Sequence, residues 1–226
     1  MKKALLLSVV LFVTCQFSPA QDQPRWELFA GYQYTRLDTH DVQKSLDLVT
    51  SSSGLPPLDL GNHLNLNGWN VSLQENPLNW IGLIFDVGGS YGKKDVNLAP
   101  ILLLPPGTTE VIRLKPSFYT YAGGPQFTYR KNSRFQPFGR VLLGLAYARA
   151  SGNVLVDGLP TLTSDLTQHQ IAFDFTAGGG IDYHFQKHWA ARVSADYIRT
   201  YFQSLNQNNA RVSVGLTYRG NGLSTF

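Results

Sequence analysis

The chain has one cysteine, Cys15, and it lies within the first 20 residues. Beyond that segment, no continuous apolar run reaches the roughly 20 residues that a transmembrane helix needs. Charge is sparse and balanced: the formal net charge is +4, and 17 basic residues face 15 acidic ones once Lys2 and Lys3 are set aside. These absences argue against a disulfide framework, thiol chemistry, helical membrane spans and a nucleic-acid partner.

The first 20 residues predict a secretory signal peptide. A basic start, Met1-Lys-Lys3, precedes an apolar segment over residues 4–17, which is too short to span a bilayer as a helix. Ser18-Pro-Ala20 then supplies the small residues that a signal peptidase reads, so we expect cleavage after Ala20. The mature chain would be one domain, residues 21–226.

Two other interpretations of this segment are weaker. A buried N-terminal helix would not need the basic start and the small residues at its end. A lipoprotein acylated at Cys15 would need a small residue where Thr14 stands. We therefore expect export through a cleaved signal, with a mature chain that has no cysteine.

The stretch from Gln168 to Tyr218 alternates between apolar and polar or small residues over long runs. In the first run the apolar positions are Ile171, Phe173, Phe175, Ala177, Gly179, Ile181, Tyr183 and Phe185. Such alternation predicts strands with one apolar and one polar face. Each run is about as long as a tilted strand that crosses a bilayer, and its aromatics lie towards the ends, as in an interfacial girdle.

A soluble β-sandwich also alternates, but three features disfavour it here. The runs exceed the five or six residues that are usual for a sandwich strand. Aromatic residues gather at the ends of the apolar faces, whereas a soluble core would spread them. The polar faces carry Asp and Arg in mid-strand, for example Asp174 and Arg192, where a sandwich exterior would favour Lys, Glu and Thr.

The same pattern recurs through the chain and predicts eight strands. They are about Trp26–Leu37, Leu64–Glu75, Asn79–Tyr91, Arg113–Arg130, Phe135–Ala150, Ile171–Phe185, Trp189–Ile198 and Arg211–Arg219. The connections alternate between tight polar turns and longer loops, the longer ones being 38–63, 92–112, 151–168 and a shorter 200–209. Transmembrane barrels have short periplasmic turns and long extracellular loops. We therefore predict an all-β fold, an eight-stranded antiparallel up-and-down transmembrane β-barrel with both termini on the short-turn side.

Several segments resemble the small outer-membrane β-barrel family that includes the OmpA transmembrane domain and OmpX. They are Glu27-Leu-Phe-Ala-Gly-Tyr-Gln-Tyr34, Phe135-Gln-Pro-Phe-Gly-Arg140, Gly178-Gly-Gly-Ile-Asp-Tyr-His-Phe185, Trp189-Ala-Ala-Arg192 and Asp196-Tyr197. The resemblance implies a monomer in the outer membrane of a Gram-negative type of cell. Its implied partners are lipopolysaccharide, phospholipid and the outer-membrane assembly machinery. It says little about function, because this family is defined by its scaffold.

A barrel of eight strands is only wide enough for side chains to fill or to hold one small ligand. The predicted inward set includes Glu27, Asp86, Asp174, Asp182 and Asp196 with Arg140, Arg192, Arg211 and Arg219. Unpaired charges in the lumen would be costly, so ion pairs across it are expected. We hypothesise that a polar network of Asp86, Arg140, Asp174, Arg192, Asp196 and Arg211 fills the middle of the barrel as a structural plug. The alternative is a gated or proton-relaying channel.

No pattern in the chain points to catalysis, and we expect no cofactor and no metal. A lipid A deacylase on this scaffold would need a His and a Ser near the outer leaflet, and His-x-Ser is absent. His184 and His188 flank a predicted periplasmic turn, and His169 has no neighbouring Ser on its face. The triple glycine Gly178–Gly180 lies in mid-strand, where it relieves crowding and lets the sheet bend.

The predicted external loops are unusually rich in leucine and proline, in Leu46–Val49, Leu55–Leu60 and Leu98–Pro106. They predict either a hydrophobic mouth for a greasy ligand or a partner protein, or loops that pack on each other or extend the barrel. The favoured function is a structural or surface-interaction role without catalysis. A narrow porin or a carrier for a small hydrophobic molecule is the alternative, and a lipid A-modifying enzyme is a weaker one.

Overall fold

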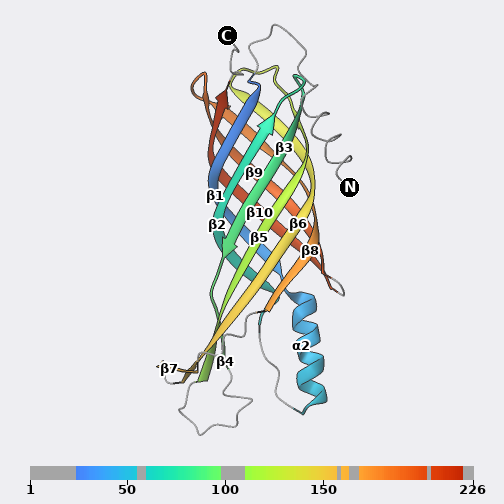
Figure 1. Ribbon diagram of the computed structural model, residues 1–226, viewed down its shortest axis with the longest axis vertical. Helices are drawn as coiled ribbons and strands as arrows, with labels where there is room; N and C mark the ends of the chain where they lie inside the picture. Colours follow the sequence, from blue (N-terminus) through green and yellow to red (C-terminus); the bar gives the residue numbers. More distant parts are fainter. Residues whose placement is uncertain are drawn as a thin grey trace, which may run out of the picture.

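The barrel closes through the pairing of each strand with its neighbours in chain order (Figure 1). The computed structural model describes residues 24–54, 60–97, 110–156, 159–162, 168–202 and 205–220. Within these residues, eight long antiparallel strands form the barrel, so the predicted fold class is confirmed. The predicted signal peptide and the loop segment 98–106 lie outside the described residues, as does most of 55–60, and those interpretations stay predictions.

The eight barrel strands overlap the eight predicted ones. They are β1 (Trp26–Asp38), β2 (His63–Glu75), β3 (Ile81–Tyr91), β5 (Glu110–Thr128), β6 (Phe135–Val156), β8 (Gln168–His184), β9 (Trp189–Phe202) and β10 (Leu205–Gly220). Two short strands, β4 (Lys94–Asn97) and β7 (Leu159–Leu162), pair with the far ends of β5 and β6. Trp26 in β1 lies opposite Gly220 in β10, so the barrel begins and ends at the same end.

The barrel exposes its apolar side chains and buries its charged ones, which is the reverse of the arrangement in a soluble protein. The outward-facing side chains of Leu83, Phe85 and Leu143 each leave more than half of their surface exposed. The inward-facing Asp86 and Arg211 are buried, with 0% and 2% exposed. Exposed apolar side chains are stable against another apolar medium and not against water. The barrel therefore presents a surface for lipid and keeps its charges inside.

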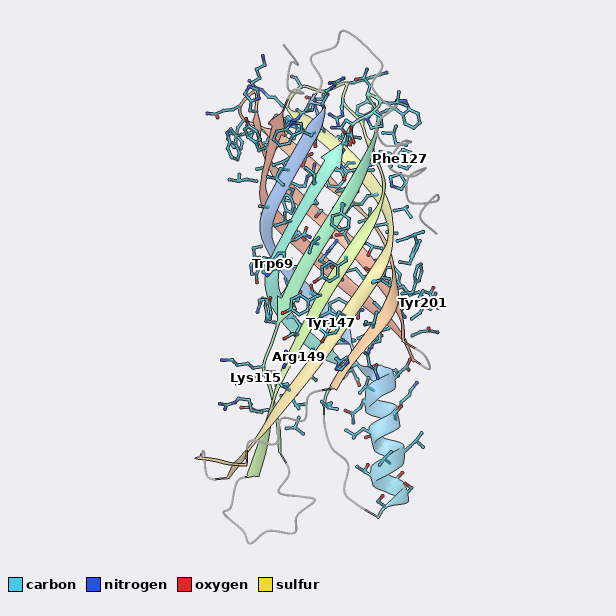
Figure 2. All side chains as sticks on the ribbon, in the orientation of Figure 1. Trp69, Lys115, Phe127, Tyr147, Arg149 and Tyr201 are labelled. Atoms are coloured by element: carbon cyan, nitrogen blue, oxygen red, sulfur yellow. The ribbon has the colours of Figure 1, made fainter. Side chains whose placement is uncertain are left out.

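Aromatic side chains mark the two edges of this lipid-facing surface (Figure 2). On β6 the edges are Phe135 and Tyr147, both on the outward face. The 12 steps between them span about 40 Å along a strand, and a tilt of 35–45° reduces this to about 30 Å across the membrane. That distance is about the thickness of a bilayer's hydrocarbon region. Tyr147 and Tyr201 lie towards the end that carries helix α2, and Phe127 lies at the opposite end.

The strands continue further at the α2 end than the alternation predicts. β5 and β6 pair without a break from Lys115 opposite Ser151 to Glu110 opposite Val156. The predicted loop over residues 200–209 is also mostly strand, since Leu205 pairs with Phe202. Alternation marks where a strand faces lipid, but backbone hydrogen bonds continue wherever two strands stay side by side. The barrel therefore projects beyond the membrane.

Helix α2 (His40–Ser52) occupies a segment that the sequence analysis assigned to a loop. The segment contains no Pro or Gly, and Asp41 lies in its first turn, where a carboxylate is favourable. The helix ends before Gly54, whose φ of 66° suits a helix terminus. Leu48 and Val49 are highly exposed, at 71% and 63%, so no buried apolar stripe marks the helix in the sequence. None of the described helical residues forms a helix long and apolar enough to cross a membrane.

The lipid face generates a first prediction, on Leu143 near the middle of the membrane span of β6. Leu143→Arg should lower the free energy of unfolding by about 2–4 kcal/mol, because the guanidinium would enter the hydrocarbon region. Leu143→Phe is the matched control and should change it little, since it keeps an apolar side chain against lipid. Urea unfolding in lipid vesicles measures both. Equal losses for the two variants would contradict the outward assignment of Leu143.

A second prediction concerns orientation, with the α2 end outside the cell. Ser51→Cys in α2 and Ser133→Cys in the short turn between β5 and β6 place exposed thiols at opposite ends. In a Cys15→Ser background, a membrane-impermeant maleimide applied to intact cells should label Cys at 51 and spare Cys at 133. Labelling of the second position alone would reverse the orientation. Labelling of both after cell lysis serves as the control.

Candidate functional site: the charged interior of the barrel

Four charged side chains form a closed ring in the middle of the lumen. Arg140 donates two hydrogen bonds to Asp196, of 2.9 Å and 2.7 Å. Arg211 donates to the same carboxylate at 3.0 Å and to Asp86 at 2.8 Å. Arg140 Nη1 lies 3.5 Å from Asp86 Oδ2 and closes the ring. In this central ring each charge has two neighbours of opposite sign, and each side chain is no more than 2% exposed.

Three of the four ion pairs of the central ring cross the lumen, whereas Arg211 and Asp196 lie opposite each other on the paired strands β10 and β9. Asp86 comes from β3, which pairs with β2 and β5, yet its arginine partners come from β6 and β10. A carboxylate buried this deeply needs charged partners, because it has lost its hydration. The ring therefore ties opposite walls of the barrel together and fills the space between them.

Smaller polar groups complete the surroundings of the central ring. Asn70 donates to Asp86 at 3.0 Å, and the hydroxyl of Thr120 lies 3.5 Å from Arg211 Nη1. A Cβ at Gly178 would collide with the Asp196 carboxylate and with the backbone of β9. Glycine is needed there for this close approach, which agrees with the predicted role of the triple glycine in relieving crowding.

A second group of charges, the short-turn cluster, lies nearer the end with the tight turns. Its strongest pair joins Arg192 to Asp182 through two hydrogen bonds of 2.6 Å and 2.7 Å. Glu27 accepts a hydrogen bond from Arg192 at 3.2 Å and forms an ion pair with Arg130 at 3.0 Å, and Arg219 lies 3.6 Å from it. These five side chains form the cluster. Glu27 shares its negative charge among three arginines.

Two aromatic rings hold Arg192 from the sides that its carboxylates leave open. Its guanidinium carbon lies 4.6 Å from the ring centre of Phe138 and 5.6 Å from that of Phe29. Both rings face inward and are buried. A desolvated guanidinium gains from such contacts with aromatic faces. Arg192 is therefore fixed in position by charge and by packing.

The structure brings together four of the six residues in the predicted network. Asp86, Arg140, Asp196 and Arg211 meet in the central ring, whereas Arg192 belongs to the short-turn cluster. Asp174 joins neither group. It is fully buried and accepts a hydrogen bond of 3.0 Å from Thr176, and its second oxygen has no hydrogen-bond partner among the described residues.

Asp182, Glu27 and Arg219 are predicted on the inner face but lie outside the predicted network, and no sequence pattern singles out Arg130. A signal for the strongest missed pair was available. The tight turn at 186–188 fixes the register of the hairpin between β8 and β9, and that register sets Asp182 opposite Arg192. Contacts between strands that are not paired cannot be predicted from hairpin register, because they depend on how the strands are staggered around the barrel.

An apolar layer closes the lumen on the α2 side of the central ring. It consists of Leu37, Leu66, Phe118 and Ala146, from four different strands. Between this layer and the ring, Gln33 donates to Ser90 at 2.8 Å, and the hydroxyls of Thr35 and Ser90 are 2.9 Å apart. The barrel interior is thus filled along its length by polar and apolar side chains in turn.

The histidines do not assemble into a catalytic arrangement within the described residues. His169 is exposed and stacks 6.2 Å from Tyr147, and His188 Nδ1 lies 3.0 Å from the Arg219 carbonyl oxygen. His184 has no hydrogen-bond partner on either ring nitrogen. Over the same described residues, no cluster of His, Cys, Asp and Glu has an arrangement that could hold a metal ion. The charged interior remains the most organised polar site.

Comparison with known proteins identifies the scaffold. The model of the outer membrane protein beta-barrel domain matches residues 4–219. The structure is similar to that of Ail from Yersinia pestis, solved in complex with the heparin analogue sucrose octasulfate, with 14% identity and a TM-score of 0.51 over 87% of this chain and 99% of that one. Neisserial surface protein A is similar at 11% identity and a TM-score of 0.51, over 89% of this chain and 99% of that one.

No curated protein matches the chain. The structural likenesses are at low identity and show the fold alone. The family model covers nearly the whole chain, including all of β1 to β9 and most of β10. Three features of the structure agree with that match: apolar side chains on the outside with charges inside, aromatic residues at the two membrane edges, and a closed antiparallel barrel. This protein belongs to the outer membrane protein beta-barrel domain family.

Proposed function

We propose that this protein is a non-catalytic outer-membrane barrel whose lumen is a closed plug and whose projecting end meets partners at the cell surface. The central ring carries the proposal. It joins β3, β6, β9 and β10 across the lumen, so an ion that passed through would have to displace charges already neutralised by each other. An eight-stranded barrel leaves little room beside them.

The two flanking layers support the same conclusion. On one side of the ring, the apolar layer of Leu37, Leu66, Phe118 and Ala146 offers no ligand for an ion. On the other side, Arg192 is bound to Asp182 and its guanidinium contacts the rings of Phe29 and Phe138. A conducting path would need all three layers to rearrange together. Filling the barrel and holding its walls in register is the role that this arrangement suits.

The surface-interaction part of the proposal rests on what projects from the barrel. Helix α2 and the extended ends of β5 and β6 lie beyond the aromatic edge marked by Tyr147 and Tyr201 (Figure 2). The exposed Leu48 and Val49 on α2 are apolar groups that contact with a partner would remove from water. Such a projection suits a protein that acts by contact at the cell surface.

Conductance tests the plug against the porin alternative and is the third prediction. The refolded chain in planar bilayers should show no steady open state, because the central ring and the apolar layer block the lumen. Circular dichroism of the same samples confirms that the barrel is folded. Arg211→Gln tests the origin of any current. Stable open channels whose ion selectivity changes in that variant would overturn the plug and support a narrow porin.

A further inference from the structure

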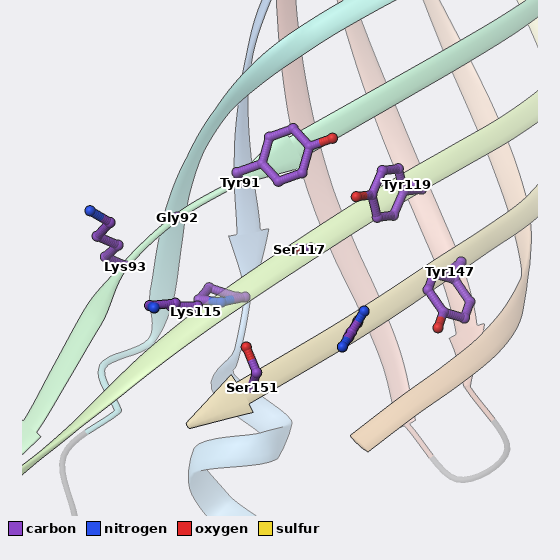
Figure 3. Close-up of a pocket in the computed structure, with 10 residues that line it drawn as sticks. Tyr91, Gly92, Lys93, Lys115, Ser117, Tyr119, Tyr147 and Ser151 are labelled. Atoms are coloured by element: carbon purple, nitrogen blue, oxygen red, sulfur yellow. The ribbon is translucent and has the colours of Figure 1, made fainter. Parts of the chain in front are cut away.

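We propose that the outer surface of β3, β5 and β6 carries a binding site for the phosphate group of an outer-leaflet lipid. The site is a depression of about 500 Å³ just beyond the aromatic edge on the α2 side (Figure 3). Three cationic side chains line it, Lys93, Lys115 and Arg149, together with the tyrosines 91, 119 and 147. It lies outside the barrel and shares no residue with the charged interior.

The tyrosines fix the level of the site relative to the membrane. The ring of Tyr119 lies 5.7 Å from that of Tyr91 and 6.2 Å from that of Tyr147, so a continuous aromatic row crosses the three strands. Aromatic rows of this kind lie at the level of lipid head groups. On the lipid side of the row, Tyr121 and Leu145 are outward and exposed. A lipid seated here would lay its chains along them.

Arg149 and Lys115 lie further from the middle of the membrane than the tyrosine row. Arg149 follows Tyr147 by two residues on the outward face of β6, and its strand partner on β5 is Ser117. Lys115 is the next outward residue on β5 and lies opposite Ser151. Figure 2 shows Arg149 and Lys115 beyond Tyr147, towards the α2 end. This is the level at which a lipid phosphate lies when its chains are in the hydrocarbon region.

None of the three cations makes an ion pair within the described parts of the chain. The neighbouring Asp95 is already taken, since Arg113 donates to it at 2.9 Å and 3.0 Å. Those hydrogen bonds, and at longer range the charges of Arg113 and Lys93, lower the pKa of Asp95 and keep its carboxylate charged. Arg113 holds both oxygens of that carboxylate, so Lys93 has no hydrogen bond to it. Three like charges gathered at one depression favour an anion between them.

The chemistry of the lining fits phosphate on a lipid better than free phosphate. Lysine and arginine supply charged donors, and the hydroxyls of Ser117 and Ser151 supply neutral ones. Basic residues next to a membrane surface attract anionic lipid head groups. A free phosphate would meet the same charges but would gain nothing from the apolar surface below the tyrosine row.

The test measures lipid binding to the full chain in detergent micelles by native mass spectrometry. The probe is lipid A with its phosphates, and the test variant is Lys93→Gln/Lys115→Gln/Arg149→Gln. The matched control is Lys131→Gln/Arg134→Gln/Lys187→Gln, which removes the same charge from exposed residues at the opposite end. We expect the test variant to lose about tenfold or more in affinity and the control to keep the wild-type affinity. Circular dichroism and urea unfolding show that both variants are folded.

Two further arms separate the sources of the phosphate. Dephosphorylated lipid A should bind the wild type as weakly as lipid A binds the test variant, and inorganic phosphate in excess should not displace lipid A. The conservative Lys115→Arg variant should keep the wild-type affinity. Equal losses in the test and control variants, or equal binding of dephosphorylated lipid A, would overturn the proposal. Displacement by inorganic phosphate would assign the site to a free anion and overturn the lipid.

Discussion

The neutralisation of charge inside a narrow barrel is the constraint on which the rest of this structure depends. A lipid-facing exterior forces apolar side chains outward, and strand alternation then sends every second residue into a lumen with room for side chains only. Asp86, Arg140, Asp196 and Arg211 meet this constraint by forming a ring in which each charge has two opposite neighbours. Three of its four ion pairs join strands that share no backbone hydrogen bonds, and the fourth joins the paired strands β9 and β10.

The neighbouring layers follow from the same constraint. Glycine at 178 leaves space for the Asp196 carboxylate, and aromatic rings cover the faces of Arg192 that its carboxylates leave bare. Asp174 is the exception, with one hydroxyl donor and no arginine. Its neighbour across the strand pair is Thr200, which is also buried.

The sequence predicts the barrel well because strand alternation and the aromatic edges are local signals. It places Asp86, Arg140, Asp196 and Arg211 on the inner face for the same reason. Alternation gives the face of a residue but not its level along the barrel axis, so it does not separate Arg192 from the residues of the central ring. The pairing of Arg192 with Asp182 follows from the register of one tight hairpin. The pairing of Asp86 with Arg211 requires the stagger of the whole barrel.

The projecting end escaped sequence analysis for a different reason. Beyond the membrane, strands and helices no longer have one face against lipid, so periodicity fades although backbone hydrogen bonding continues. Helix α2 exposes Leu48 and Val49, and β5 and β6 run on as a paired ribbon past Lys115 and Ser151. The basic depression at the root of this ribbon was missed as well. Its residues come from β3, β5, β6 and the link after β3, and only the pairing of the strands brings them together.

The central claim is that charges coupled across the lumen hold the barrel closed, and a double-mutant cycle on Asp86 and Arg211 tests it most directly. Asp86→Asn, Arg211→Gln and the double variant would be unfolded in urea in the same vesicles. The account predicts that the sum of the two single losses in unfolding free energy exceeds the loss in the double variant by about 1–3 kcal/mol, because each single change leaves its buried partner with one opposite charge where it had two. Losses that simply add would contradict it, since the two side chains would then contribute independently.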